Sequence, residues 1–145
     1  MASRSVAGYN APLEDKECQD FHTWLKDRGI PHEHIPNESR SSKKDALIRG
    51  RKLKSMGVSS GYWDYDVYVP VKDPDGKIGG YELIKIEMKR SRKNLSKVSQ
   101  EQKDWGKIYT LAGIECHICY GALDAELIVS AIYERINMEK LAIDF

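Results

Sequence analysis

The run Asp73-Pro74-Asp75-Gly76-Lys77 separates two stretches in which apolar and polar residues alternate, residues 63–71 and 81–89. A proline followed by an Asp-Gly pair favours a tight chain reversal. Alternation with a period of two is typical of β-strands. The sequence therefore predicts a β-hairpin built from these two stretches, and the remaining elements are placed around it.

The register of this hairpin brings two acidic residues together. A turn centred on Asp75 and Gly76 places Asp64 opposite Glu87, because each acid lies eleven residues from that centre. Like charges that face each other across a hairpin destabilise it unless a cation lies between them. Lys89 lies two residues beyond Glu87 and points to the same side of the strand. The three side chains predict a divalent-cation site at one end of the hairpin.

The second strand of the hairpin has one apolar and one charged face. We expect the apolar face to be buried, and it consists of Ile84, Ile86 and Met88. We expect the other face to border a groove or solvent, where a substrate can reach it, and it consists of Lys85, Glu87 and Lys89. The predicted cation site lies on this second face.

The length of 145 residues fits one domain with a hydrophobic core. We expect residues 1–11 to form a flexible tail and residues 12–145 to form the single domain. No stretch approaches the roughly 20 apolar residues of a membrane span. The first residues lack a signal-peptide core, and the three cysteines cannot all pair, so a cytoplasmic setting is expected.

Positive charge is concentrated in two segments although the net charge is only +1. Such segregation is typical of a groove that binds a polyanion, because phosphate contacts depend on local charge. The alternative is two solvated charged loops. We expect DNA contacts from Lys43, Lys44, Arg49, Arg51, Lys52 and Lys54 in the first segment, and from Arg90, Arg92 and Lys93 in the second.

Further elements complete an α/β fold with a mixed sheet flanked by helices, in the order α-β-β-β-α-β-α. A helical pattern begins at Pro12 and ends near Arg28, and a short strand covers residues 32–36. Ser99 and Gln102 have the spacing of an N-terminal capping box, which predicts a helix that ends at Gly113. A strand over 114–120 and a helix over 123–137 follow. That last helix is apolar nearly all round, which suits either packing on both sides within its own domain or burial of one side in a partner subunit.

Two acids in the first helix compete for an inward position. Glu14 shares a stripe with the apolar residues Cys18 and Phe21, while Glu17 shares one with Phe21 and Trp24. An inward acid needs a charged or metal partner. Glu14 also lies in the first turn, where the helix dipole favours an exposed acid. The residues alone leave these alternatives open.

Two other patterns allow a metal site but do not favour one. His32 and His34 share one face of a short strand, so a metal pair and a plain surface are both compatible with them. Cys116 and Cys119 lie three residues apart on a strand and should point to opposite faces, which argues against a shared ion.

A carboxylate pair beside a lysine and between basic segments suits metal-assisted hydrolysis of a phosphodiester. Mg²⁺ takes one or two carboxylates and keeps positions for water and phosphate oxygens. We predict Asp64 and Glu87 as ligands of Mg²⁺, with Mn²⁺ able to substitute, and the backbone carbonyl of Met88 as a third. Lys89 would orient the water or offset charge in the transition state.

Several runs also match one family in order and spacing, from Glu14 to about Tyr120. They are His34-Ile35-Pro36-Asn37-Glu38, Lys52-Leu53-Lys54-Ser55-Met56, Gly57-Val58-Ser59-Ser60-Gly61-Tyr62-Trp63-Asp64, Ile86-Glu87-Met88-Lys89 and Ser99-Gln100-Glu101-Gln102-Lys103-Asp104-Trp105. In these runs the chain resembles the virus-type replication-repair nuclease (VRR-NUC) domain, a branch of the PD-(D/E)XK nucleases. The resemblance implies a restriction-endonuclease-like sheet core.

The resemblance also implies roles for single residues. Asp64 resembles the family's metal-binding aspartate, and Glu87 and Lys89 resemble its E-x-K pair. Gln102 resembles the glutamine that opens the next helix, and Glu14 resembles the first-helix glutamate, held to the metal directly or through water. Trp63 stands where the family usually has proline. Cys18 stands where it has glutamine, so Glu17 stays an alternative to Glu14.

Stand-alone members of the family are small, phage-encoded, homodimeric endonucleases that cut branched DNA such as Holliday junctions. The resemblance therefore implies an Mg²⁺-dependent, structure-selective endodeoxyribonuclease of DNA repair, working in the cytoplasm of a host cell. A non-catalytic module that binds branched DNA is the alternative. Sequence-specific restriction is less well supported, because no recognition insertion is visible.

Overall fold

The computed structural model describes residues 13–35, 51–52, 55–57 and 59–144. The expected flexible tail at 1–11 lies outside these residues. The same is true of four of the basic residues expected to contact DNA, which are Lys43, Lys44, Arg49 and Lys54. The assignment of residues 12–145 to one domain stays a prediction.

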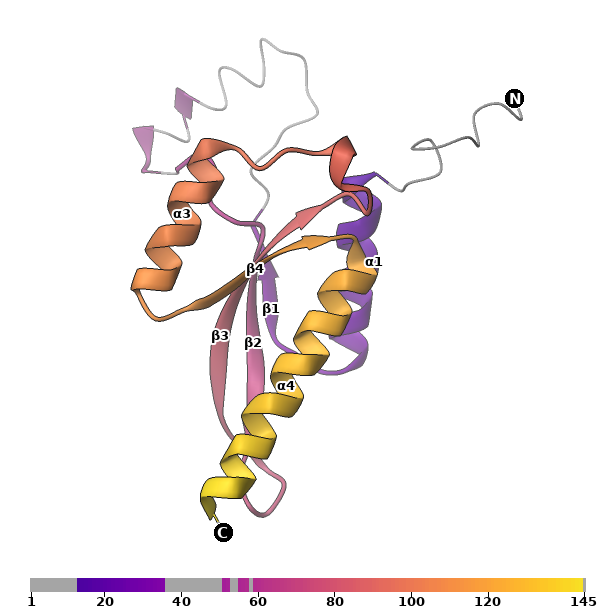
Figure 1. The fold of residues 1–145 in the computed structure, drawn as a ribbon, viewed down its shortest axis with the longest axis vertical. Coiled ribbons are helices and arrows are strands. Elements are labelled where there is room, and N and C mark those ends of the chain that lie inside the picture. The colour runs from indigo at the N-terminus through magenta and orange to yellow at the C-terminus, as the bar shows by residue number, and fades with distance from the viewer. Residues whose placement is uncertain (1–12, 36–50, 53–54, 58, 145) are drawn as a thin grey trace, which may run out of the picture.

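The described part of the chain forms a four-stranded mixed sheet with three helices (Figure 1). The helices are α1 (Glu14–Asp27), α3 (Gln100–Leu111) and α4 (Ala122–Asp144), and a short 3₁₀ turn, η3, covers Lys93–Leu95. The strands are β1 (His32–His34), β2 (Tyr65–Lys72), β3 (Ile78–Lys89) and β4 (Glu115–Tyr120). The predicted α/β class is confirmed.

The strands lie in the order β1-β2-β3-β4 across the sheet. Strands β1, β2 and β3 pair antiparallel, and β4 pairs parallel to β3. A parallel neighbour requires a crossover connection, and here α3 provides it. Each helix therefore covers a face of the sheet. Strand β3 ends at a short loop, residues 90–99, which leads to the start of α3.

The hairpin between β2 and β3 has the predicted register over most of its length. Tyr65 pairs with Ile86, and the pairing continues without a shift to Val71 opposite Gly80. Closer to the turn the prediction is wrong by one residue, because Lys72 pairs with Ile78 across a bulge. A β-bulge inserts an extra residue into one strand. The end of the hairpin at Tyr65 and Ile86 therefore keeps the register that a turn centred on Asp75 and Gly76 would give.

The turn itself is organised by Asp73. Its Oδ1 accepts hydrogen bonds from the backbone N–H groups of Asp75 at 3.0 Å and Lys77 at 2.9 Å. Gly76 has a φ of +79°, which glycine adopts without steric cost. The reversal therefore begins two residues before the Asp-Gly pair, and this explains the shift at Lys72.

The apolar core lies between the sheet and the two helices α1 and α4. Ile84, Ile86 and Met88 of β3 are fully buried there, as predicted. Phe21 and Leu25 contribute from α1, and α4 contributes residues such as Val129 and Ile132. Figure 1 shows α1 and α4 on one side of the strands and α3 on the other. The apolar faces of α1 and α4 are buried in this core.

The prediction that the charged face of β3 borders a groove or solvent is wrong. Lys85, Glu87 and Lys89 are only 1%, 2% and 6% exposed. Aromatic side chains cover this face, with Tyr62 and Tyr109 directly over the Lys85 ammonium at 4.0 and 4.9 Å from their ring centres. Lys85 is also ion-paired with Asp66 on β2. The alternation of residues along a strand does not show what packs on either face. The sequence therefore did not predict that aromatic side chains cover this face.

None of the helices that the structure describes is long and apolar enough to cross a membrane.

Candidate metal-binding site

Three carboxylates from three elements meet at the end of β3. Glu14 at the start of α1, Asp64 just before β2 and Glu87 in β3 each offer an oxygen, and these oxygens lie within 4.8 Å of one another. The structure therefore brings together the two acids that hairpin register predicted. It also places Glu14, rather than Glu17, in their company.

Asp64 is fixed against β3 by two hydrogen bonds. Its backbone N–H donates to Glu87 Oε1 at 3.2 Å, and its Oδ2 accepts from the backbone N–H of Met88 at 2.9 Å. These bonds extend the hairpin one step beyond the first ladder pair of β2. Each acid is therefore held by the strand that carries the other.

The backbone carbonyl of Met88 is directed toward the same edge of β3. The next carbonyl, that of Lys89, accepts from the N–H of Gly121 beyond β4 at 2.9 Å. Successive carbonyls of a strand point to opposite edges, and a residue's N–H and C=O point to the same edge. The Met88 N–H already points at Asp64. The geometry of the strand is thus compatible with the predicted carbonyl ligand, which stays a prediction.

Gln102 connects α3 to the site. Its Nε2 donates to Glu87 Oε2 at 2.8 Å, and its Oε1 accepts from Lys89 Nζ at 2.9 Å. The same Oε1 accepts from the backbone N–H of Ser99 at 3.0 Å, and Ser99 Oγ accepts from the N–H of Gln102 at 3.1 Å. The predicted capping box is confirmed. One amide thus caps the helix and orients both members of the E-x-K pair.

Lys89 lies beside Glu87 inside the protein. Its Nζ is 3.3 Å from Glu87 Oε2. An ammonium has three N–H donors. Two are directed at Gln102 and Glu87, so the lysine has a defined position relative to the acids.

Burial perturbs the two central carboxylates, and repulsion adds to its effect on Glu87. Burial, followed by the charge of Asp64, raises the pKa of Glu87 to about 8, although Lys89 opposes this shift. Burial likewise raises the pKa of Asp64, against the hydrogen bond from Met88. Both shifts have the direction expected of carboxyl groups that are removed from water.

The donor set fits a hard divalent cation. Carboxylate and carbonyl oxygens are the ligands that Mg²⁺ and Mn²⁺ take in proteins. A cation between the three carboxylates would offset the effects that raise the pKa values of Asp64 and Glu87. Neither histidine nor cysteine belongs to the cluster, so the described ligands do not favour zinc.

Trp63, directly before Asp64, joins the site to α3. Its indole Nε1 donates to the backbone carbonyl of Gln102 at 2.8 Å, and its backbone N–H donates to Tyr109 Oη at 3.2 Å. Gly106 makes room for the ring, since a Cβ there would lie 3.0 Å from Trp63 Cζ2. Sequence reasoning noted only that the family has proline here and missed this contact.

Glu17 has a different task from Glu14. It is 5% exposed, and its Oε1 accepts from the N–H of Ala122, the first residue of α4, at 3.2 Å. A carboxylate at a helix N-terminus is favoured by the helix dipole. Gly121 permits the approach, because a Cβ there would lie 2.9 Å from Glu17 Oε2. Glu17 thus joins α1 to α4. Of the two acids of the first helix, Glu14 is therefore the one that lies with Asp64 and Glu87.

The remaining sequence candidates do not belong to the acid cluster. Cys116 Sγ contacts Thr110 of α3 while Cys119 belongs to the apolar core, so the two thiols lie on opposite faces of β4 as predicted. The Nε2 of His32 lies 2.7 Å from Nδ1 of His22. His34 instead stacks on Tyr65 with ring centres 4.7 Å apart. The two strand histidines therefore have separate partners.

The described basic residues expected to contact DNA have separate positions. Arg92 and Lys93 are exposed in the segment after β3, and Arg90 is partly exposed there. The backbone N–H of Arg90 donates to Ser96 Oγ at 3.1 Å, which closes this segment into a compact loop. Arg51 and Lys52 are exposed. The loop after β3 therefore brings positive charge within a few residues of Glu87 and Lys89.

Comparisons with protein-family models, curated proteins and solved structures give no match to this chain. The site must therefore be interpreted from its own geometry and chemistry.

Proposed function

We propose that this protein is a metal-dependent endodeoxyribonuclease that hydrolyses phosphodiester bonds in branched DNA. One observation carries the proposal, namely the meeting of Glu14, Asp64 and Glu87 with the lysine and glutamine that contact Glu87. Acids that only stabilised the fold would gain nothing from being buried beside one another. The VRR-NUC resemblance and its restriction-endonuclease-like core form part of the proposal, and the mixed sheet is compatible with both.

The carboxylates of Glu14, Asp64 and Glu87, with the Met88 carbonyl, would hold Mg²⁺ or Mn²⁺. A cation bound there would polarise a phosphate oxygen and raise the acidity of a water molecule. Lys89 uses its remaining N–H to orient the attacking water or to offset charge on the phosphate. Gln102 keeps Glu87 and Lys89 in their relative positions.

The substrate follows from the charge near the site. The loop that contains Arg90, Arg92 and Lys93 starts directly after Lys89 and suits contacts with a phosphate backbone. These residues bind DNA through its backbone, so they do not select a sequence. Preference for branched DNA, Holliday junctions included, comes from the family resemblance.

We further propose a homodimer that places two such sites on two strands. Helix α4 has three exposed large apolar residues, with Leu123 69%, Leu127 62% and Met138 68% exposed. Leu123 and Leu127 lie one turn apart, and Met138 lies about three turns further along. A stripe of this kind suits a twofold helix pairing. A reducing cytoplasmic setting completes the proposal and agrees with the free thiols of Cys18, Cys116 and Cys119.

The test compares a labelled four-way junction with a linear duplex of the same sequence, in Mg²⁺, Mn²⁺ or chelator. We expect cuts near the branch that require metal and fall at least about a hundredfold in Asp64→Asn. Asp75→Asn is the matched control. It changes the same functional group in the exposed turn, where Asn-Gly also suits a hairpin, and should cut like the parent.

Two outcomes separate the proposal from the non-catalytic alternative. Junction binding without nicking in either metal, unchanged in Asp64→Asn, would identify a binding module. Cutting that persists in chelator and in Asp64→Asn would show that these acids are not the catalytic centre.

A further inference from the structure

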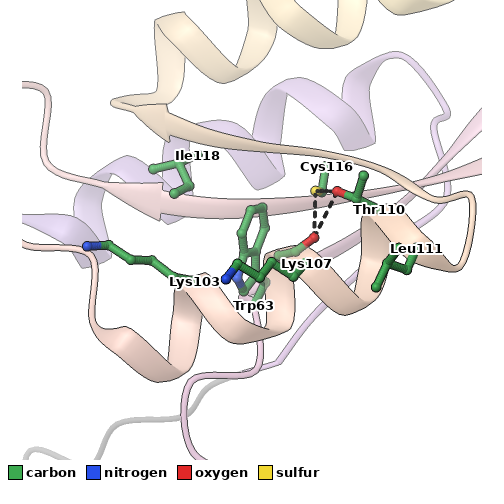
Figure 2. A pocket seen from close by; sticks show the side chains of 8 residues that line it. Trp63, Lys103, Lys107, Thr110, Leu111, Cys116 and Ile118 are labelled. Carbon is green, nitrogen blue, oxygen red and sulfur yellow. Dashed lines mark hydrogen bonds between the residues drawn. The ribbon is translucent and has the colours of Figure 1, made fainter.

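A surface pocket lies beside the candidate site, between α3 and β4. Its volume is about 580 Å³, which is within the range of small-ligand pockets. Figure 2 shows Lys103, Lys107 and Leu111 following one another along α3, with Trp63 and Cys116 beside them. The lining is completed by Gly106, Thr110 and Ile118.

Two residues that line the pocket are chain neighbours of residues at the candidate site. Trp63 directly precedes Asp64 and donates its indole N–H to the Gln102 carbonyl. Lys103 directly follows Gln102 in the first turns of α3. A ligand in the pocket would therefore touch the two segments that position the carboxylates.

The lining surface is almost wholly apolar, and two of the side chains that contribute to it are lysines. Leu111 is 88% exposed, and Ile118 and Trp63 contribute further apolar contact. Lys103 and Lys107 stand one helical turn apart, and none of the eight lining residues is acidic. This chemistry suits a ligand with a flat apolar body and adjacent anionic groups.

The same face of β4 leads from the pocket to the basic loop after β3. Tyr120 lies two residues beyond Ile118 and so on the same side of the strand. The Lys93 ammonium stands 5.1 Å from the centre of the Tyr120 ring. Aromatic and cationic side chains interleaved in this way are typical of surfaces that bind single-stranded nucleic acid.

We propose that this pocket binds an unpaired nucleotide of the DNA next to the cleaved bond. Its base lies against Leu111 and Ile118, and its phosphates lie on Lys103 and Lys107. This inference rests on the proposed nuclease function, and it supplies a reason for branch preference, since a base at a branch point is more easily unpaired and unstacked than a base inside a linear duplex.

The experiment measures binding in chelator, so that it does not depend on cleavage. The probes are a duplex with one unpaired 2-aminopurine and a fully paired duplex of otherwise identical sequence. Leu111→Glu and Lys107→Glu introduce negative charge at exposed pocket positions. Ile108→Glu is the matched control for the first, because Ile108 is 51% exposed on α3 and does not line the pocket. Lys77→Glu, in the distant hairpin turn, is the control for the second.

We expect each pocket variant to weaken binding of the unpaired probe about tenfold, with binding of the paired duplex nearly unchanged. The 2-aminopurine fluorescence should change on binding to the parent and to both controls, and less for the pocket variants. Equal losses on both probes would overturn the proposal, because they mark the lysines as general phosphate contacts. Unchanged affinity for both probes would also overturn it.

Two further measurements distinguish the nucleotide pocket from a protein interface and from the nuclease function. Sedimentation of Leu111→Glu tests whether the pocket is a protein interface, and conversion of a dimer to a monomer would overturn the nucleotide proposal. Cleavage in Mg²⁺ tests the nuclease function separately. A parent that binds the unpaired probe through the pocket but cuts no DNA refutes the nuclease and leaves the subsite supported.

Discussion

Strand β3 contributes to two faces of the sheet that are buried by different physical means. Ile84, Ile86 and Met88 pack into the apolar core against α1 and α4. The residues between them, Lys85, Glu87 and Lys89, are as deeply buried under α3 and its aromatic residues. The first face is stabilised by removing apolar surface from water. The second depends on pairing each charge, and this is where groups with unusual pKa values can be held.

Neighbouring substitutions on the two faces should separate stability from activity, and this is the largest effect expected. Glu87→Gln should reduce cleavage at least about a hundredfold. It should leave the metal-free fold as stable or more stable, because it removes a carboxylate whose charged form is disfavoured by burial and by Asp64. Ile86→Ala should lower the free energy of unfolding by about 2–5 kcal/mol and leave cleavage at low temperature largely intact. Denaturant unfolding in chelator and junction cleavage measure the two quantities. A large loss of stability in Glu87→Gln would contradict the contrast.

Variants of the ion pair between Lys85 and Asp66 test whether the stability of the charged face of β3 depends on pairing its charges. Lys85→Met leaves Asp66 beside β3 without its cation, which should cost about 3–5 kcal/mol of unfolding free energy. Lys85→Met combined with Asp66→Leu should recover most of that loss, since neither charge is then buried alone. Urea denaturation of the two single variants and the double variant gives the coupling energy. Additive losses would mean that the pair does not act as a unit.

The raised pKa of Glu87 should make the metal-free protein less stable as pH rises. The folded protein holds the Glu87 proton up to about pH 8, whereas the unfolded chain releases it near the ordinary value of 4.5. The folded state therefore binds more protons between these values, and stability falls across that window. Thermal unfolding in chelator should follow this trend. Glu87→Gln should flatten it, and an equally steep trend in that variant would assign the effect to other groups.

The smallest effect is expected at the contact between α3 and the site. Trp63→Phe removes the N–H that donates to the Gln102 carbonyl and keeps most of the ring volume, so the rate of cleavage should fall several-fold with little change in KM. Trp105→Phe is the control, because it makes the same change of side chain at a residue that stacks on Tyr109 in the same aromatic cluster. Equal loss of rate in both variants would point to a general weakening of the aromatic layer.

Local signals predicted the parts of this fold that are set locally. The Asp-Gly turn gave the hairpin, and its register brought Asp64 to Glu87 although the turn itself begins at Asp73. The spacing of Ser99 and Gln102 gave the start of α3. Each of these depends on residues close together in the chain or on a symmetric pairing, so the sequence contains the necessary information.

What the sequence could not provide depends on contacts between distant segments. The rings of Tyr62 and Tyr109 cover Lys85, and the pattern of residues in β3 does not predict this contact. Helical spacing alone could not separate Glu14 from Glu17, because residues three apart share a helix face. The partner that distinguishes them, Ala122, is 105 residues away from Glu17 in the chain.

The double use of Gln102 has a consequence for the order in which the protein matures. The amide that closes the first turn of α3 is the same amide that lies between Glu87 and Lys89. A growing chain that has left the ribosome only as far as Lys89 holds both acids of the hairpin but lacks this amide. Helix nucleation is the slow step in forming a helix, so completion of the site coincides with it. The acid cluster therefore gains the amide that fixes Glu87 and Lys89 only when the first turn of α3 has formed.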